Sequence, residues 1–316
     1  MIYFKEVISV DTWKGLVMKK FVMIGLLLLL SMIDLTGQDG TRDPSYGTDG
    51  FQGLHSGYKA FNLARFYESN NSIANFYFLG LLQPNSVPSI CLLKSNGALE
   101  PGWITGTYGW YTNLFTTSPG CYVAVQNNSK LIAATSAGTS ITVWRWADSS
   151  LPWPDFQFIG STNIDLEEYT AFCRGVLVDD LNRIIVLTSL TQGYETSVGI
   201  VRLTPEGFPD TTFNGTGTAV FPLNNYTLLP SDMALRPNRG IVVASTGQNL
   251  SLGRDEVVVA DILENGTLNP YFGNGGFASS HIYSQATANS VALQTDGKVV
   301  VGGYTGTQNS GRFCVV

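Results

Sequence analysis

A short peptide built from proline, aromatic and glycine residues recurs along the chain. The stretch "LNPYFGNGGF", residues 268–277, matches "RDPSYGTDGF", residues 42–51, at its proline, aromatic-glycine, glycine and phenylalanine positions. Weaker copies lie between these two, and successive aromatic anchors are 53–59 residues apart. The anchors are Tyr46, Trp103, Phe156, Phe213 and Phe272. A period of this length predicts a repeat architecture in which each unit packs on its neighbours.

A second motif with the same period predicts a β-hairpin. In "NSVALQTDGKVVVGG", residues 289–303, two short apolar runs flank Asp296 and Gly297. An Asp-Gly pair between such runs predicts a tight turn, because glycine readily adopts the positive φ that the turn needs. Corresponding segments begin at Cys121, Gly175 and Asp232, and a degraded copy lies at residues 69–81.

A third element completes each repeat with a short run that is rich in valine and isoleucine. It occurs as "SICLLK", "SITVWRW", "VGIVRL" and "EVVVADI", and it precedes each later copy of the first motif. Such a run predicts a strand, and so does "FASSHIY" after the last copy of the first motif. Glycines such as Gly47 and Gly273 allow a sharp connection, while the aromatic anchor packs between layers.

The predicted fold is therefore an all-β β-propeller of about five four-stranded repeats, each 53–59 residues long, over residues 38–316. One four-stranded repeat cannot bury both of its faces alone, whereas a radial arrangement packs sheet upon sheet. A β-solenoid is the chief alternative, but its coils are usually shorter.

The two ends of the repeat region predict how the ring closes. The segment "GRFCVV", residues 311–316, ends inside the third element, where a further copy of the first motif is due. We expect the N-terminal segment from Asp43 to Phe51 to complete this last blade by pairing with the C-terminal strand. A truncated array, in which further repeats follow, is the alternative.

The N-terminal region predicts export. Lys19 and Lys20 precede "FVMIGLLLLLSMI", residues 21–33, as the charged and apolar regions of a signal peptide do. Thirteen apolar residues are too few to span a bilayer, which takes about 20, and a buried core helix is the alternative. We expect a signal region at residues 1–37, with Met18 as a possible true start, and no membrane span after cleavage. The mature chain is then secreted, periplasmic or at the cell surface.

Composition and motif searches argue against several kinds of chemistry. The net charge is −6, and no basic cluster occurs beyond Lys19 and Lys20, so we expect no nucleic-acid partner. None of the four cysteines forms the C-x-x-C pair that is typical of zinc sites. The chain has two histidines, His55 and His281, and no P-loop. We therefore expect no metal site, no cofactor and no catalytic residue.

Adjacent carboxylates and one pair of tryptophans are the remaining candidates. Glu167–Glu168, Asp179–Asp180 and Asp255–Glu256 are predicted to lie in solvated turns, and neighbours in a strand point to opposite faces. Trp144 and Trp146 are two residues apart in a predicted strand, so both indoles lie on one face, with Arg145 on the other. Such a platform stacks on a sugar or a peptide aromatic ring, or else fills the space between blades.

The combination of "VVVADILENGTLNPYFGNGGF" with "SVALQTDGKVVVGG" resembles the delta-60 repeat, a β-propeller-like repeat of bacterial exported and surface proteins. The pattern is well kept over residues 198–303 and weaker over residues 50–190. There, Trp103 replaces the usual phenylalanine and "VDDLNR" replaces the usual hairpin. The resemblance implies a fold and export, and it assigns no catalytic or cofactor-binding residue.

Two functions from different classes fit the sequence. The first is an exported, non-catalytic and monomeric propeller that binds a protein or a carbohydrate or acts as a scaffold. The second is an exported hydrolase or lyase with a site over the central channel. Ionisable residues from several blades around the channel are expected of the enzyme only.

Export has a direct test. Expressed in a bacterial host with a C-terminal tag, the protein should lose about 37 residues, because cleavage is expected after Gly37, and leave the cytoplasm. N-terminal sequencing of the tagged protein measures this. Intact cytoplasmic protein that still carries residues 21–33 would contradict the prediction.

Overall fold

The computed structural model describes residues 121–126, 130–146, 161–282, 285–306 and 312–316, and five strands before them. These five strands are β1 (Met32–Asp34), β2 (Phe51–Gly53), β3 (Lys59–Tyr67), β4 (Ala74–Leu82) and β5 (Val87–Leu93). Every regular element in the described part of the chain is a β-strand, as the sequence predicts.

The strands after β2 form five antiparallel sheets, each built from strands consecutive in sequence, which we number as blades 1 to 5. Blade 1 consists of β3–β5. Blade 2 contains β6 (Cys121–Val125), β7 (Leu131–Ala137), β8 (Ser140–Trp146) and β9 (Ser161–Asp165). Blade 3 contains β10 (Thr170–Val178), β11 (Ile184–Gln192), β12 (Glu195–Leu203) and β13 (Thr218–Phe221).

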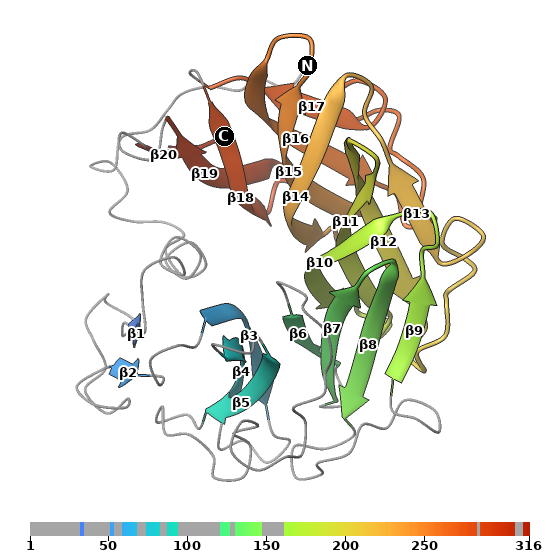
Figure 1. Ribbon diagram of the computed structural model, residues 1–316, viewed down its shortest axis with the longest axis vertical. Helices are drawn as coiled ribbons and strands as arrows, with labels where there is room; N and C mark the ends of the chain where they lie inside the picture. Colours follow the sequence, from blue (N-terminus) through green and yellow to red (C-terminus); the bar gives the residue numbers. More distant parts are fainter. Residues whose placement is uncertain are drawn as a thin grey trace.

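Blade 4 contains β14 (Tyr226–Leu235), β15 (Ile241–Asn249), β16 (Arg254–Ile262) and β17 (Phe277–Ser280). Blade 5 contains β18 (Ala286–Leu293), β19 (Val299–Thr305) and β20 (Arg312–Val315). The blades stand around a common centre, with β3, β6, β10, β14 and β18 as the innermost strands (Figure 1). The fold is a β-propeller, and blades 2, 3 and 4 each have the four strands that the repeat predicts.

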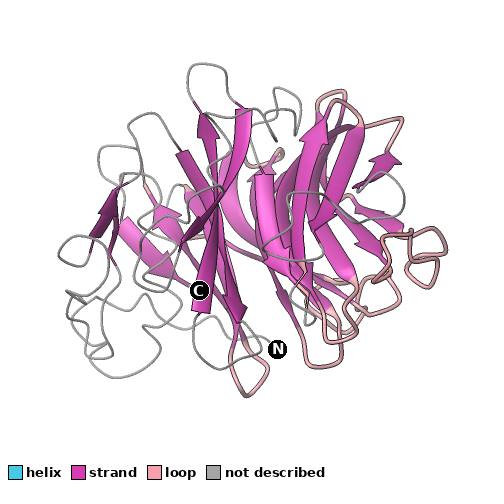
Figure 2. Ribbon diagram, turned by 90° about the horizontal axis from the view of Figure 1, so that it is seen from below, coloured by secondary structure: helices cyan, strands magenta, loops and turns pink. Residues whose placement is uncertain are grey.

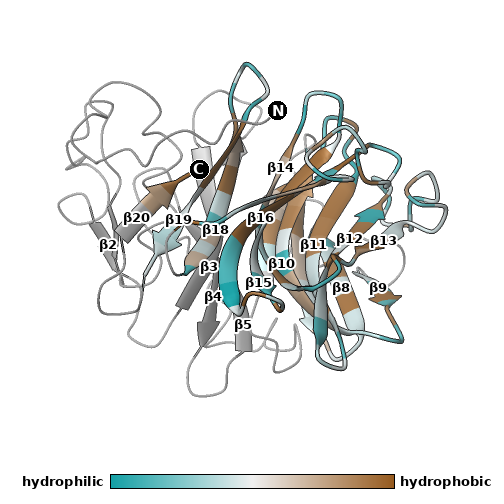
Figure 3. Ribbon diagram, turned by 90° about the horizontal axis from the view of Figure 1, so that it is seen from above, coloured by the Kyte–Doolittle hydropathy of each residue, from teal (hydrophilic) through white to brown (hydrophobic). Residues whose placement is uncertain are grey.

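The core consists of apolar layers between neighbouring blades. Seven consecutive residues of β11, from Ile184 to Leu190, are buried, because this strand packs against a blade on each side. Separate apolar clusters lie between blades 2 and 3, blades 3 and 4, and blades 4 and 5. The strands are accordingly apolar and the connecting turns polar, and the turns gather at the two rims of the ring (Figures 2 and 3).

The hairpin between the first two strands of a blade has the same turn in blades 3, 4 and 5. Its five residues are 179–183, 236–240 and 294–298, and in each the first amide donates to the carbonyl of the fifth residue. The fourth residue has a positive φ: Asn182 (62°), Arg239 (62°) and Gly297 (83°). The predicted hairpin and the role of Gly297 are confirmed, and "VDDLNR" forms the same turn with asparagine in place of glycine.

The first motif forms the turn between the third and fourth strands. Phe213 is fully buried between blades 3 and 4, whereas Phe272 is half-buried against the core between blades 4 and 5. Gly273 has a φ of 55°, as its place in a sharp connection requires. The predicted repeat residues Tyr46, Gly47, Trp103 and Phe156 lie outside the described residues.

The predicted closure of the ring falls mostly on residues that the structure does not describe. Of the segment from Asp43 to Phe51 that was expected beside the C-terminal strand, Phe51 begins β2, which pairs with β1. Blade 5 has the order β18-β19-β20, and β20 is hydrogen-bonded to β19 alone among the described strands. Closure of the ring by the N-terminal segment therefore stays a prediction. Residues 43–50 lie outside the described residues.

A substitution in the last hairpin tests its turn. Gly297→Val should destabilise the protein by about 1–3 kcal/mol, because a β-branched residue is strained at a positive φ. The space around Gly297 is open, so the cost comes from the backbone alone. Thr295→Val, in the same exposed turn, is the control and should have little effect. Urea unfolding measures both, and equal stability of the two variants would contradict the assigned turn.

Candidate functional site

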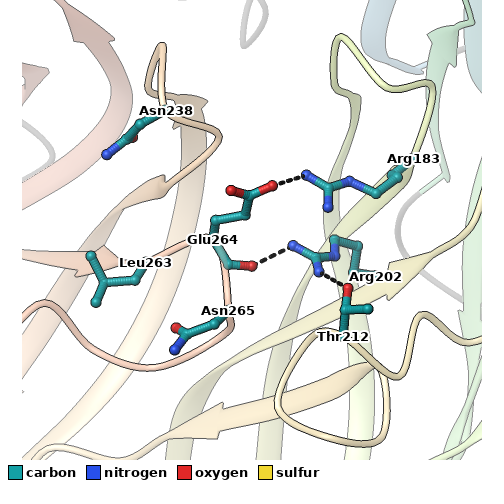
Figure 4. A pocket seen from close by; sticks show the side chains of 7 residues that line it. All are labelled: Arg183, Arg202, Thr212, Asn238, Leu263, Glu264 and Asn265. Carbon is teal, nitrogen blue, oxygen red and sulfur yellow. Dashed lines mark hydrogen bonds and ion pairs between the residues drawn. The ribbon is translucent and has the colours of Figure 1, made fainter.

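A pocket of about 540 Å³ opens at one rim, where blades 3 and 4 meet. It lies beside the hairpins that join β10 to β11 and β14 to β15, and beside the turns after β12 and β16. Two arginines and a glutamate give it its charge (Figure 4). The lining residues are Arg183, Arg202, Thr212, Asn238, Leu263, Glu264 and Asn265.

Arg202 at the end of β12 is the most deeply placed charge of this pocket, with 2% of its side chain exposed. Its Nε donates to Asp210 Oδ2 at 2.7 Å, and one Nη donates to Thr212 Oγ1 at 2.8 Å. The other Nη donates to the backbone carbonyl of Glu264 in blade 4 at 2.5 Å. The guanidinium also lies 4.6 Å from the centre of the Phe213 ring, a cation–π contact. Arg202 thus links the first motif of blade 3 to blade 4.

Arg183 and Arg239 hold the outer side of the pocket together. Arg183 donates to Asp179 Oδ2 at 2.6 Å within blade 3 and to Glu264 Oε1 at 3.0 Å in blade 4. Arg239 of blade 4 reaches back to Asp180 of blade 3 at 2.8 Å, and it also donates to Glu264 at 3.4 Å. The Glu264 carboxylate therefore receives one arginine from each blade.

The surroundings of these groups keep them charged near neutral pH. Burial raises the pKa of Asp210, but hydrogen bonds from Thr212 and the Arg202 guanidinium outweigh burial and bring it below its usual value. A hydrogen bond from Arg183 lowers the pKa of Glu264. Burial and the Arg183 charge lower the pKa of Arg202. A general acid for glycoside cleavage needs a carboxyl pKa raised above its ordinary range, and both carboxyls here shift the other way.

The contact from Arg202 to blade 4 recurs between blades 2 and 3. Arg145 occupies the place in β8 that Arg202 occupies in β12, and it donates to the backbone carbonyl of Pro205 at 2.6 Å. Pro205 and Glu264 are equivalent residues in the turns that follow β12 and β16. A guanidinium from one blade thus binds a turn carbonyl of the next blade at both joints.

The hairpins at this rim form a second series of links. Gln126, the first residue of its turn, donates to the carbonyl of Asn182 at 2.8 Å in blade 3. Arg236 holds the same place in blade 4 and donates to the carbonyl of Gly297 at 3.2 Å in blade 5. In blade 3 the equivalent residue is Asp179, whose carboxylate accepts from Arg183 of the same blade, and Arg239 makes the link in the opposite direction. The pocket is one joint in a repeated polar belt.

The tryptophan candidates both lie in β8. Trp144 is half-buried, and Arg145 contacts blade 3 from the opposite face of the strand, as the alternation of a strand predicts. Trp146 ends the strand, and its side chain lies outside the description. The structure therefore confirms the strand, and Trp144 is not among the residues that line the pocket between blades 3 and 4.

Two of the three carboxylate pairs differ from the solvated turns predicted for them. Asp179–Asp180 lies in a hairpin turn in which Asp180 is exposed but Asp179 is buried, and Asp255–Glu256 lies in strand β16. Asp179 is 4% exposed, because its carboxylate accepts hydrogen bonds from Leu181 N and Arg183 N inside the hairpin turn. Glu256 lies in β16 and is 3% exposed, accepting from the Tyr226 hydroxyl at 2.7 Å. Glu167 and Glu168 lie exposed in a turn, as predicted.

Sequence reasoning missed Arg183, Arg202 and Glu264, although one signal was present. Arginine stands at the same place in two copies of the third element, "VWRW" and "IVRL". A charge repeated inside a strand that is otherwise apolar indicates a position where the fold supplies a partner.

Cys173 and Cys314 are free and buried. Burial raises the pKa of the Cys173 thiol to about 12, so it stays protonated and unreactive. Within the described ranges, histidine, cysteine and acidic side chains nowhere gather in threes suited to a metal ion. The same ranges contain no helical segment with the length and hydropathy of a membrane span.

Comparison with known proteins agrees with the architecture. A family model described as a domain of unknown function (DUF5122) beta-propeller matches residues 182–213 in blade 3 and residues 294–316 in blade 5. No curated protein matches the chain.

Solved structures resemble the chain only distantly. A mannose phosphorylase from Leishmania mexicana is 14% identical, with a TM-score of 0.39 over 82% of this chain and 84% of that one. An endo-arabinase from Bacteroides thetaiotaomicron is 9% identical, with a TM-score of 0.38 over 82% and 93%. At these scores the likeness says nothing about activity.

Removing the Arg202 charge tests whether the pocket is a structural joint. Arg202→Met should destabilise the protein by about 3–5 kcal/mol, because it leaves buried Asp210 without its partner. Lys298→Met is the control: Lys298 is 75% exposed and pairs with half-exposed Asp296, so its loss should change little. Urea unfolding compares the variants, and a small effect at Arg202 would contradict its structural role.

Proposed function

We propose that the chain is an exported, non-catalytic β-propeller of delta-60 repeats that acts as a binding or scaffold module for a protein or carbohydrate ligand. The repeat pattern over residues 198–303 and the β-propeller family match in blades 3 and 5 support this assignment. Export is proposed from the signal-like segment at residues 1–37.

The single observation that carries the proposal is the state of the charges in the pocket between blades 3 and 4. Asp210 and Glu264 each accept from an arginine, and both have a lowered pKa. They are therefore held ionised and engaged in joining blades, which suits a rigid scaffold better than proton transfer to a substrate.

Exposed apolar side chains at the opposite rim favour a binding role. Tyr194, in the hairpin from β11 to β12, is fully exposed. Leu250 and Leu252, in the corresponding hairpin of blade 4, are 56% and 59% exposed. Loops carried on a rigid scaffold commonly provide recognition surfaces, and an exposed aromatic ring supplies contact area at low entropic cost.

One experiment separates this proposal from an exported hydrolase or lyase. The purified mature chain is incubated with soluble and immobilised polysaccharides, and both retention on the matrix and release of reducing or unsaturated ends are measured. A binding module is retained on a matrix or a protein partner and releases no ends. Release of ends by the wild type that is lost in Glu264→Gln would contradict the proposal and place chemistry in the rim pocket.

A further inference from the structure

The innermost strands of four blades are interrupted by a β-bulge, and the bulges of blades 3, 4 and 5 stand at equivalent places before the hairpin turn. The pairing register shifts across Phe61 in β3, Arg174 in β10, Ser231 in β14 and Asn289 in β18. Bulges re-aim side chains and are frequent beside functional sites. Because β10, β14 and β18 stand side by side around the centre of the ring (Figure 1), the bulges of blades 3, 4 and 5 lie on neighbouring innermost strands.

Contacts between blades show that the bulges are built into the fold. The amide of Cys173, just before the blade 3 bulge, donates to Ser136 Oγ of blade 2 at 2.9 Å. The amide of Ala288, at the same place in blade 5, donates to Thr246 Oγ1 of blade 4 at 3.1 Å. In blade 4 this place is taken by Pro230, which has no amide proton. A neighbouring blade thus satisfies the amide that the bulge releases from the ladder.

Arg174, the bulge residue of blade 3, differs from the other arginines of the propeller. Its Nε is buried without a hydrogen-bond partner, and its guanidinium lies 5.9 Å from the centre of the Phe172 ring. Its side chain is half-exposed. Five other arginines in the described part of the chain are ion-paired with carboxylates: Arg183, Arg202, Arg236, Arg239 and Arg254. Arg174 therefore brings an uncompensated positive charge to the innermost strand.

The bulges of the next two blades bring polar groups without a competing charge. Ser231 is half-buried, and its hydroxyl donates to the carbonyl of Ala244 at 3.1 Å, which leaves its oxygen as an acceptor. Asn289 is exposed. The neighbouring carboxylate, Asp232, accepts from Ser290 Oγ at 3.0 Å and Val291 N at 2.9 Å in blade 5, so it is turned away from blade 3.

We propose that Arg174 anchors an anion site at the centre of the ring and that its ligand is a sugar acid, a sugar that carries a carboxylate. The planar guanidinium matches a carboxylate with two parallel hydrogen bonds. The guanidinium lies over the Phe172 ring, and the side chains of Ser231 and Asn289 suit the hydroxyl groups of a sugar ring. This inference rests on the proposed binding function and names the ligand class for it.

Titration calorimetry on the full mature chain tests the site with glucuronate as the probe. Glucose, which lacks the carboxylate, is the uncharged control ligand. Wild-type protein should bind glucuronate more tightly than glucose, and Arg174→Gln should weaken glucuronate binding roughly tenfold or more by removing the charge. Arg174→Lys should bind glucuronate with an affinity between those of the wild type and Arg174→Gln. Lysine keeps the positive charge but cannot form the two parallel hydrogen bonds of a guanidinium. Lys298→Gln, in an exposed turn, is the control and should bind like the wild type.

Three outcomes would overturn the inference: equal affinity for glucuronate and glucose, unchanged binding in Arg174→Gln, or inorganic phosphate binding more tightly than glucuronate. Matching thermal midpoints for the Gln and Lys variants establish that a loss of binding is not a loss of fold. Retention on polysaccharides and turnover of polysaccharides are measured in a separate experiment. If glucuronate does not bind at Arg174, the binding-module proposal still stands, whereas turnover would contradict that proposal.

Discussion

The guanidinium of Arg202 is the interaction on which the architecture most depends. The Arg202 side chain is 2% exposed, and a charged group buried this deeply is tolerated only when its donors are hydrogen-bonded. All of its partners but one come from the first motif of its own blade. Asp210 and Thr212 accept from it, and Phe213 lies under it. The remaining partner is a carbonyl of blade 4. The first motif therefore supplies the partners of a buried guanidinium that joins one blade to the next.

The same position carries the opposite charge one blade later. Asp261 in β16 replaces Arg202, and Arg236 from the hairpin of the same blade binds it through two hydrogen bonds of 3.1 and 3.0 Å. Asn269, which stands where Asp210 stands in blade 3, donates to Asp261 at 3.2 Å. Each of the two blades therefore has an ion pair at this position of its third strand, which is an arginine in blade 3 and an aspartate in blade 4. The geometry of the repeat is preserved although its residues change.

Repetition explains which features could be predicted from the sequence. Strand order, the hairpins and the burial of Phe213 follow from local patterns that recur, so one well-kept copy identifies the weaker ones. The polar joint could not be found this way, because Arg183, Arg239 and Glu264 meet only when two blades are stacked. Closure by the segment from Asp43 to Phe51 stays a prediction, because the pairing of an edge strand depends on which other strand reaches that edge, and no local pattern specifies that partner.

The account's central claim is that polar joints lock neighbouring blades into one unit. The backbone amide of Asn214 in blade 3 reports on this directly, because it donates across the joint to the carbonyl of Asn265 in blade 4 at 2.8 Å. Amide hydrogen exchange, followed by NMR, measures how often this bond opens. The account predicts that Asn214, although it lies in an exposed turn, exchanges as slowly as the amides of the central strands β11 and β15. Exchange of the Asn214 amide at the rate of an open loop would contradict it.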